Sequence, residues 1–141
     1  MNASFEEKSV WVQLASLVIA LGSYTVTASR MMAAGVSELS AYATVFAGSI
    51  LLLVAVIVAG HIALAIVNRD QSSDERDRII TWRAESHTAW IMAFGIITSL
   101  GALVTGTELL WVAHGLLFSL YLSEIAAFAL RIFYYRRGLP A

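Results

Sequence analysis

Two ionisable side chains, Glu124 and His61, stand within long stretches that are otherwise uncharged, and they are the first candidates for chemistry. If such stretches lie in lipid, a charged carboxylate there is unfavourable unless it is protonated or paired, so residues of this kind are functional candidates. Counted from the polar ends of their stretches, Glu124 lies roughly 10 Å and His61 about 9 Å inside the same boundary. Their matching depth predicts a hydrogen bond between them if their helices touch, with Ser123 as an additional donor.

Three interpretations of this candidate buried polar site stay open. The pair is a polar clasp that fixes the register of two helices, or it forms a proton-relay or substrate site. Alternatively, Glu124 has no partner and its side chain reaches toward the aqueous boundary.

The second candidate is the polar segment 68–85, which carries much of the charge of the chain. Both signs occur there within little more than one helical turn, which favours a docking surface for a cytoplasmic partner; the residues are Asp74, Glu75, Arg76, Asp77 and Arg78. Solvated charges that only orient the chain are the alternative. Ser72 and Glu75 have the spacing of a capping box, so a helix is expected to start near Ser73.

The composition of the chain indicates that lipid surrounds it. Of its 141 residues, 59% are hydrophobic and 13% are charged, whereas soluble domains have about 25% charged residues. Four apolar stretches are each long enough to cross a hydrocarbon layer of roughly 30 Å as a helix. We expect spans at about 9–30, 41–67, 86–106 and 109–131, with 68–85 as a polar hinge between the second and the third.

These stretches predict an all-α membrane protein with a single domain, 1–141. Backbone groups in lipid must be hydrogen-bonded within the chain, so each span should be a helix. Short connections make neighbouring helices antiparallel and give an up-down-up-down bundle. Small residues predict the helix contacts; they recur at Ala55, Ala59 and Ala63 and at Gly95, Ser99, Ala102 and Gly106.

Lys and Arg predict the orientation. Eight of these residues fall on the side of the hinge and of both termini, against Arg30 alone on the other side. Cytoplasmic loops carry the excess of positive charge, so the hinge and both termini should be cytoplasmic. The acidic start and the long first apolar run favour a retained span over a cleaved signal peptide.

The residues that several classes of functional site require are absent from the sequence. The chain has no cysteine, which excludes disulfides and thiolate metal sites, and it has no phosphate-binding loop, nucleophile elbow or basic tract for nucleic acid. A haem would need two histidines that face each other at one depth; His61 and His87 are the pair considered, while His114 has no histidine opposite it. We expect no enzymatic activity, no metal and no cofactor.

Three signatures carry a resemblance. They are F-E-E-K-S-V-W at 5–11, D-E-R-D-R-I-I at 74–80, and L-S-E at 122–124 with Y-Y-R-R-G at 134–138. In this order the chain resembles a family of small bacterial four-span membrane proteins with a DERDR cytoplasmic hinge. The resemblance implies an inner-membrane location, and a signalling role, because members are often encoded beside a small helix-turn-helix regulator. The family has an amide residue at the position of His114, which argues against a ligand role for this histidine.

The leading hypothesis is therefore a multi-pass protein of the bacterial cytoplasmic membrane, non-enzymatic, that docks a cytoplasmic regulatory protein through 68–85. The alternative is a small proton-coupled transporter or ligand-binding membrane protein centred on Glu124 and His61. A haem or quinone redox protein is the third hypothesis. A homo-oligomer is compatible with each of them.

Overall fold

The computed structural model describes residues 4–68 and 74–139. It contains four long helices, α1 (Phe5–Ala33), α2 (Ala43–Val67), α3 (Glu75–Val104) and α4 (Leu109–Arg137), and a short 3-10 helix, η1 (Leu39–Tyr42), before α2. All four helices are long and apolar enough to cross a membrane. The prediction of an all-α chain with four apolar helices, as in a multi-pass membrane protein, is confirmed at this level.

The helices run past the predicted spans mainly at one end of the molecule. α1, α3 and α4 include polar turns at 5–8, 75–85 and 132–137 that were placed outside the spans. At the start of α1 the Ser4 hydroxyl accepts a hydrogen bond from the amide of Glu7. Ser4 and Glu7 have the spacing of a capping box, but only this half of it forms, because the carboxylate of Glu7 pairs with Arg136.

The start of α3 differs from the prediction. Asp74 is the N-cap, and the carboxylate of Asp77 accepts a 2.8 Å hydrogen bond from the amide of Asp74, so these two residues form the capping box. Ser72 and Ser73 lie outside the described residues. From Glu75 onward the hinge is helical and continuous with the third apolar stretch.

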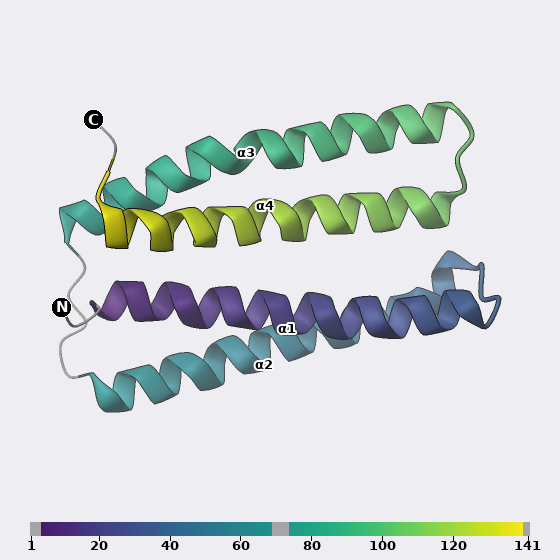
Figure 1. Ribbon diagram of the computed structural model, residues 1–141. Coiled ribbons are helices and arrows are strands. Elements are labelled where there is room, and N and C mark those ends of the chain that lie inside the picture. The colour runs from purple at the N-terminus through teal and green to yellow at the C-terminus, as the bar shows by residue number, and fades with distance from the viewer. Residues whose placement is uncertain (1–3, 69–73, 140–141) are drawn as a thin grey trace.

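Successive helices are antiparallel and lie side by side in the order α3, α4, α1, α2 (Figure 1). The substantial contacts between long helices are α1 with α2, α3 with α4, and α1 with α4. α1 therefore separates α2 from α4, and the chain forms two hairpins joined through their inner helices.

The core follows from this order. Its main part lies between α1, η1 and α4, where Leu17, Ala20, Tyr24, Tyr42 and Tyr121 are buried. A smaller cluster of Ile80, Ala84 and Tyr134 joins α3 to α4 at the end where the chain begins. The outer faces of α2 and α3 are apolar and exposed, as expected for surfaces in contact with lipid.

One of the two small-residue patterns marks a helix contact. A Cβ atom on Gly95 would overlap the side chain of Ser119, and one on Gly115 would lie 3.5 Å from Ser99 Oγ. The backbones of α3 and α4 therefore approach closely there, and Gly95 and Ser99 are buried as predicted. Gly106 has no such role: it has a φ of 81° in the following turn, a conformation that glycine adopts without steric cost.

The prediction that the alanine pattern on α2 marks a helix contact is wrong. Ala55, Ala59 and Ala63 are exposed. α2 instead approaches α1 through Gly60, where an added Cβ would overlap Val12. The reason is that α2 packs against only one long helix, so only one of its faces is used.

Candidate functional site

Each of the three main helix contacts contains one hydrogen bond between a histidine and a hydroxyl group. His61 Nε2 lies 2.8 Å from Ser9 Oγ between α2 and α1. His114 Nε2 lies 3.1 Å from the Tyr24 hydroxyl between α4 and α1, and His87 Nδ1 lies 3.0 Å from the Tyr134 hydroxyl between α3 and α4. The histidines are thus components of the helix packing.

His61 forms hydrogen bonds through both ring nitrogens. Its Nδ1 lies 2.9 Å from the carbonyl oxygen of Ile57, which can only accept, so Nδ1 donates, and in the neutral tautomer Nε2 accepts the hydrogen of Ser9. Gln13 Nε2 donates to Ser9 Oγ at 3.1 Å. Ser9 and Gln13 on α1 and His61 on α2 therefore form a chain of satisfied polar groups.

The predicted bond between His61 and Glu124 is not formed, because α1 separates their helices. Glu124 is exposed on α4 and has no hydrogen bond or ion pair with any residue in the described ranges. Ser123 is buried next to it but donates to the carbonyl oxygen of Thr88 on α3 at 3.3 Å. The candidate polar site of His61, Ser123 and Glu124 is thus divided among three helix surfaces.

The histidine pair considered for haem is also separated. His61 belongs to α2 and His87 to α3, the two outer helices of the row, with α1 and α4 between them (Figure 1). His114 lies in the core, and its Nδ1 lies 2.8 Å from the carbonyl oxygen of Leu110. No two of these rings face each other across a shared gap.

Polar side chains at the end of α4 tie it to both neighbours. Arg136 Nε donates to Glu7 Oε1 of α1 at 3.1 Å, and its guanidinium lies 5.6 Å from the centre of the Trp11 ring. On the other side, Arg131 Nη2 donates to Thr81 Oγ1 of α3 at 2.7 Å. We call this end of the molecule, which also holds the first turns of α1 and α3, the charged end.

Tyr135 completes these contacts. Its hydroxyl donates to Asp77 Oδ1 at 2.9 Å. Burial raises the pKa of Tyr135 above its ordinary value of 10.0, and the hydrogen bond to Asp77 and the negative charges of Asp77 and Glu6 raise it further. Asp77 therefore both caps α3 and holds α4, which makes it a structural residue.

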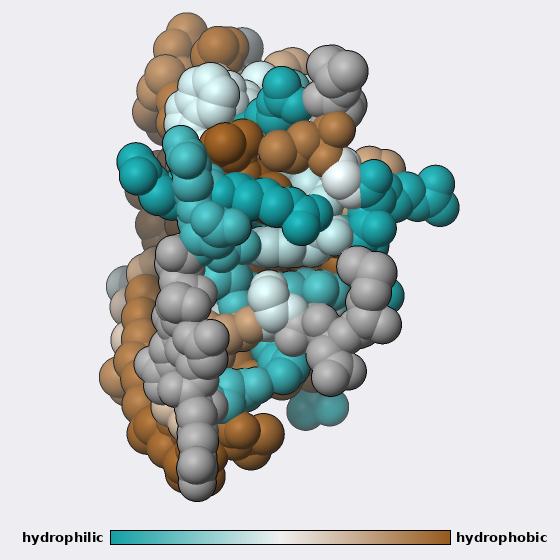
Figure 2. Space-filling model, turned by 90° about the vertical axis from the view of Figure 1, so that its left-hand side faces the viewer, coloured by the Kyte–Doolittle hydropathy of each residue, from teal (hydrophilic) through white to brown (hydrophobic). Residues whose placement is uncertain are grey.

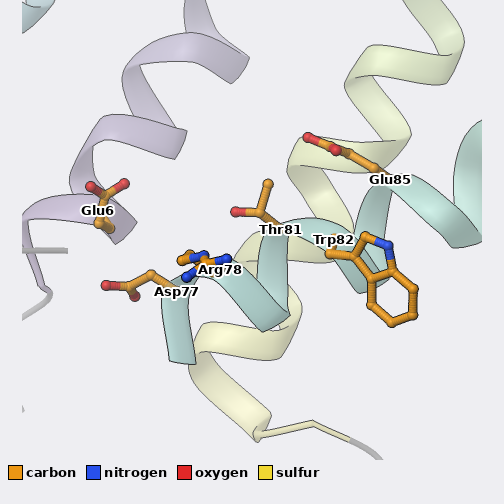
Figure 3. A pocket seen from close by; sticks show the side chains of 6 residues that line it. All are labelled: Glu6, Asp77, Arg78, Thr81, Trp82 and Glu85. Carbon is orange, nitrogen blue, oxygen red and sulfur yellow. The ribbon is translucent and has the colours of Figure 1, made fainter. Parts of the chain in front are cut away.

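The charged end also contains an open hollow of about 260 Å³ beside α4. Figure 3 shows Glu6 of α1 opposite five residues of α3 across it; those residues are Asp77, Arg78, Thr81, Trp82 and Glu85. Figure 2 shows that hydrophilic side chains gather on this end and hydrophobic ones along the flanks. Carboxylates predominate in the lining, with Arg78 as its cation.

The five charged residues singled out in the sequence divide into two groups. Asp74 and Asp77 serve the helix start, whereas Glu75, Arg76 and Arg78 are exposed on the first turns of α3. Sequence reasoning missed Ile79 and Trp82, which are 42% and 69% exposed on the same turns. Their signal was present, since residues three or four apart share one helix face.

No family model, curated protein or solved structure matches this chain. The resemblance to a bacterial four-span family therefore stays a prediction.

Within residues 4–68 and 74–139, no three His, Asp or Glu side chains are placed to hold a metal ion together. The features that point outward are the exposed face at the start of α3, the hollow beside it, and Glu124.

Proposed function

We propose that this chain is a non-enzymatic signalling or interaction protein of the bacterial cytoplasmic membrane that docks a cytoplasmic partner through the start of α3. The observation that carries the proposal is the exposed mixed face of Arg76, Arg78, Ile79 and Trp82, which lies before the expected third span. Trp and Arg are the residues that most often dominate the affinity of protein interfaces. Asp74 and Asp77 have structural roles, so we do not include them in the docking surface. The docking surface consists of Glu75, Arg76, Arg78, Ile79 and Trp82.

The rigidity of this face supports the proposal. The capping box of Asp74 and Asp77 fixes the first turn of α3, and the bond from Tyr135 to Asp77 holds that turn against α4. A surface that is already ordered loses less conformational entropy when a partner binds. The positive-inside distribution of Lys and Arg supports its cytoplasmic location.

Orientation is tested with single cysteines, because the chain has none of its own. Ser37→Cys lies before η1, at the opposite end of the molecule from Glu75→Cys at the start of α3. In intact spheroplasts, a membrane-impermeant maleimide should label Ser37→Cys, and it should label Glu75→Cys only after permeabilisation. Labelling of Glu75→Cys from outside would place the docking surface on the wrong side and refute the proposal.

Docking is tested with a photo-crosslinking amino acid at Ile79, expressed in the native host. We expect one discrete cross-linked partner, lost when Arg76→Glu and Arg78→Glu are combined. The matched control is Arg137→Glu, which reverses another exposed charge at the same end of the molecule and should leave the cross-link unchanged. Absence of a cross-link, or its survival in the double variant, would contradict the proposal.

The two other hypotheses have less support from geometry. A transporter centred on His61 and Glu124 needs these residues together, and they are on helices α2 and α4, which have no substantial contact with each other in the described residues. A haem protein needs facing histidines, and a Soret band in the absorption spectrum of the purified protein would be its signature.

A further inference from the structure

Glu124 has unusual surroundings for a carboxylate. It lies in the middle of α4, with Leu120 one turn before it and Phe128 one turn after it. It is exposed on a helix long and apolar enough to span a membrane, so in a bilayer this side chain faces lipid. A carboxylate at such a depth is unfavourable by several kcal/mol unless it is protonated or a counter-charge reaches it.

The chain does not supply that counter-charge within its described residues. The nearest cation on the same face of α4 is Arg131, seven residues or two helical turns away, roughly 10 Å along the axis. Arg131 is held on α3 and does not pair with Glu124: its Nη2 donates to Thr81, its guanidinium lies 5.5 Å from the centre of the Phe128 ring, and its buried Nε has no hydrogen-bond partner among the described residues. Ser123, the adjacent hydroxyl, faces α3 and donates to the Thr88 carbonyl oxygen.

We propose that Glu124 is the binding site for a lipophilic organic cation, an ammonium or phosphonium with apolar substituents, which reaches α4 from the bilayer. The charge of such a ligand would pair with the carboxylate, and its substituents would contact Leu120, Phe128 and the surrounding lipid chains. Opposite charges attract far more strongly in this low-dielectric setting than in water. A ligand of this class can enter lipid, which a hydrated metal cation or a small polar amine does not readily do.

The charged end provides a second acidic station on the same face of α4. Residues seven and eleven positions after Glu124 are Arg131 and Tyr135, which recur on one helix face with it. Their partners, Thr81 and Asp77, line the hollow at the charged end. That lining holds three carboxylates, Glu6, Asp77 and Glu85, and one cation, Arg78, at the aqueous end of the helix face that carries Glu124.

The test uses tetraphenylphosphonium, a permanently charged apolar cation, and the full chain in lipid nanodiscs. Equilibrium dialysis should detect saturable binding at one site per chain, above the uptake by empty nanodiscs. Triphenylphosphine oxide, a neutral compound of similar shape, should show no saturable binding. Lack of saturable binding of the cation would overturn the proposal.

Glu124→Gln should weaken binding at least tenfold, because it removes the charge and keeps the shape of the side chain. Glu108→Gln is the matched control, since Glu108 is an exposed glutamate at the opposite end of α4, and it should bind as the parent does. Thermal unfolding of both variants establishes that they are folded. Equal saturable binding by parent and Glu124→Gln would place the cation elsewhere on the protein and refute this site, while leaving the docking proposal untouched.

Discussion

His114 Nε2 and the Tyr24 hydroxyl oxygen lie 3.1 Å apart in the core, where they join α4 to α1. Both residues are buried, with 6% and 4% of their surfaces exposed. Nδ1 of the same ring lies 2.8 Å from the Leu110 carbonyl oxygen and must donate to it, so in the neutral tautomer Nε2 accepts the hydrogen of Tyr24. Tyr42 of η1 packs edge-on against this ring, and the three residues hold the two hairpins together.

Tyr24→Phe should destabilise the protein by about 1–2 kcal/mol, because it leaves the buried Nε2 of His114 without a donor. The measurement is thermal unfolding in detergent, followed by circular dichroism. Tyr121→Phe is the control: Tyr121 belongs to the same core, and no residue in the described part of the chain hydrogen-bonds to its hydroxyl. Equal effects of the two substitutions would show that the bond to His114 contributes nothing specific.

Gly95→Ala should destabilise the contact between α3 and α4 by about 1–3 kcal/mol, the usual effect of overpacking. The new methyl group would overlap Ser119 Cβ and Oγ, and Ser119 has no long side chain that could move away. Gly101→Ala lies on the same helix with nothing within 4 Å of its added Cβ, so it should be neutral or slightly stabilising through helix propensity. Comparison of the two unfolding temperatures isolates the steric effect; a stable Gly95→Ala variant would rule out the close approach.

The stability that Tyr135 contributes should be lost in alkali. Its pKa is raised above 10.0 in the folded state, first by burial and then by Asp77, so the folded protein holds this proton more tightly than the unfolded chain does. The stabilisation is therefore complete below about pH 10 and is lost as the pH rises above the unfolded pKa toward the folded one. Unfolding temperatures between pH 8 and pH 11 should fall less for Tyr135→Phe than for the parent, and parallel profiles would show that this tyrosine is not the cause.

Helix number and approximate bounds could be predicted from the sequence because they follow from local properties. Uncharged runs long enough for a membrane appear directly in the residues, and Gly95 and Ser99 mark a helix contact through their small size. The N-cap of α3 could not be predicted uniquely. Ser72 and Asp74 both have an acidic residue three positions later, Glu75 and Asp77, so both fit the capping-box spacing.

Which helices touch was not predictable in this way. Equal depths of His61 and Glu124 suggested a contact, but depth describes one coordinate only, and the row order places α1 between them. The alanines of α2 were misleading for the same reason. A helix face made of small residues permits close packing, but it does not specify which helix packs there. Ser9 and Tyr24, the true partners of His61 and His114, are common residues whose hydroxyls carry no positional signal in the sequence.

The row arrangement has a consequence for how the protein is made. Each hairpin contains its own helix contact, α1 with α2 and α3 with α4, and the two hairpins meet through α1 and α4. The first pair can therefore leave the ribosome and settle in the bilayer before the second has been translated. The contacts that join the two halves, Tyr24 with His114 and Glu7 with Arg136, would then form last.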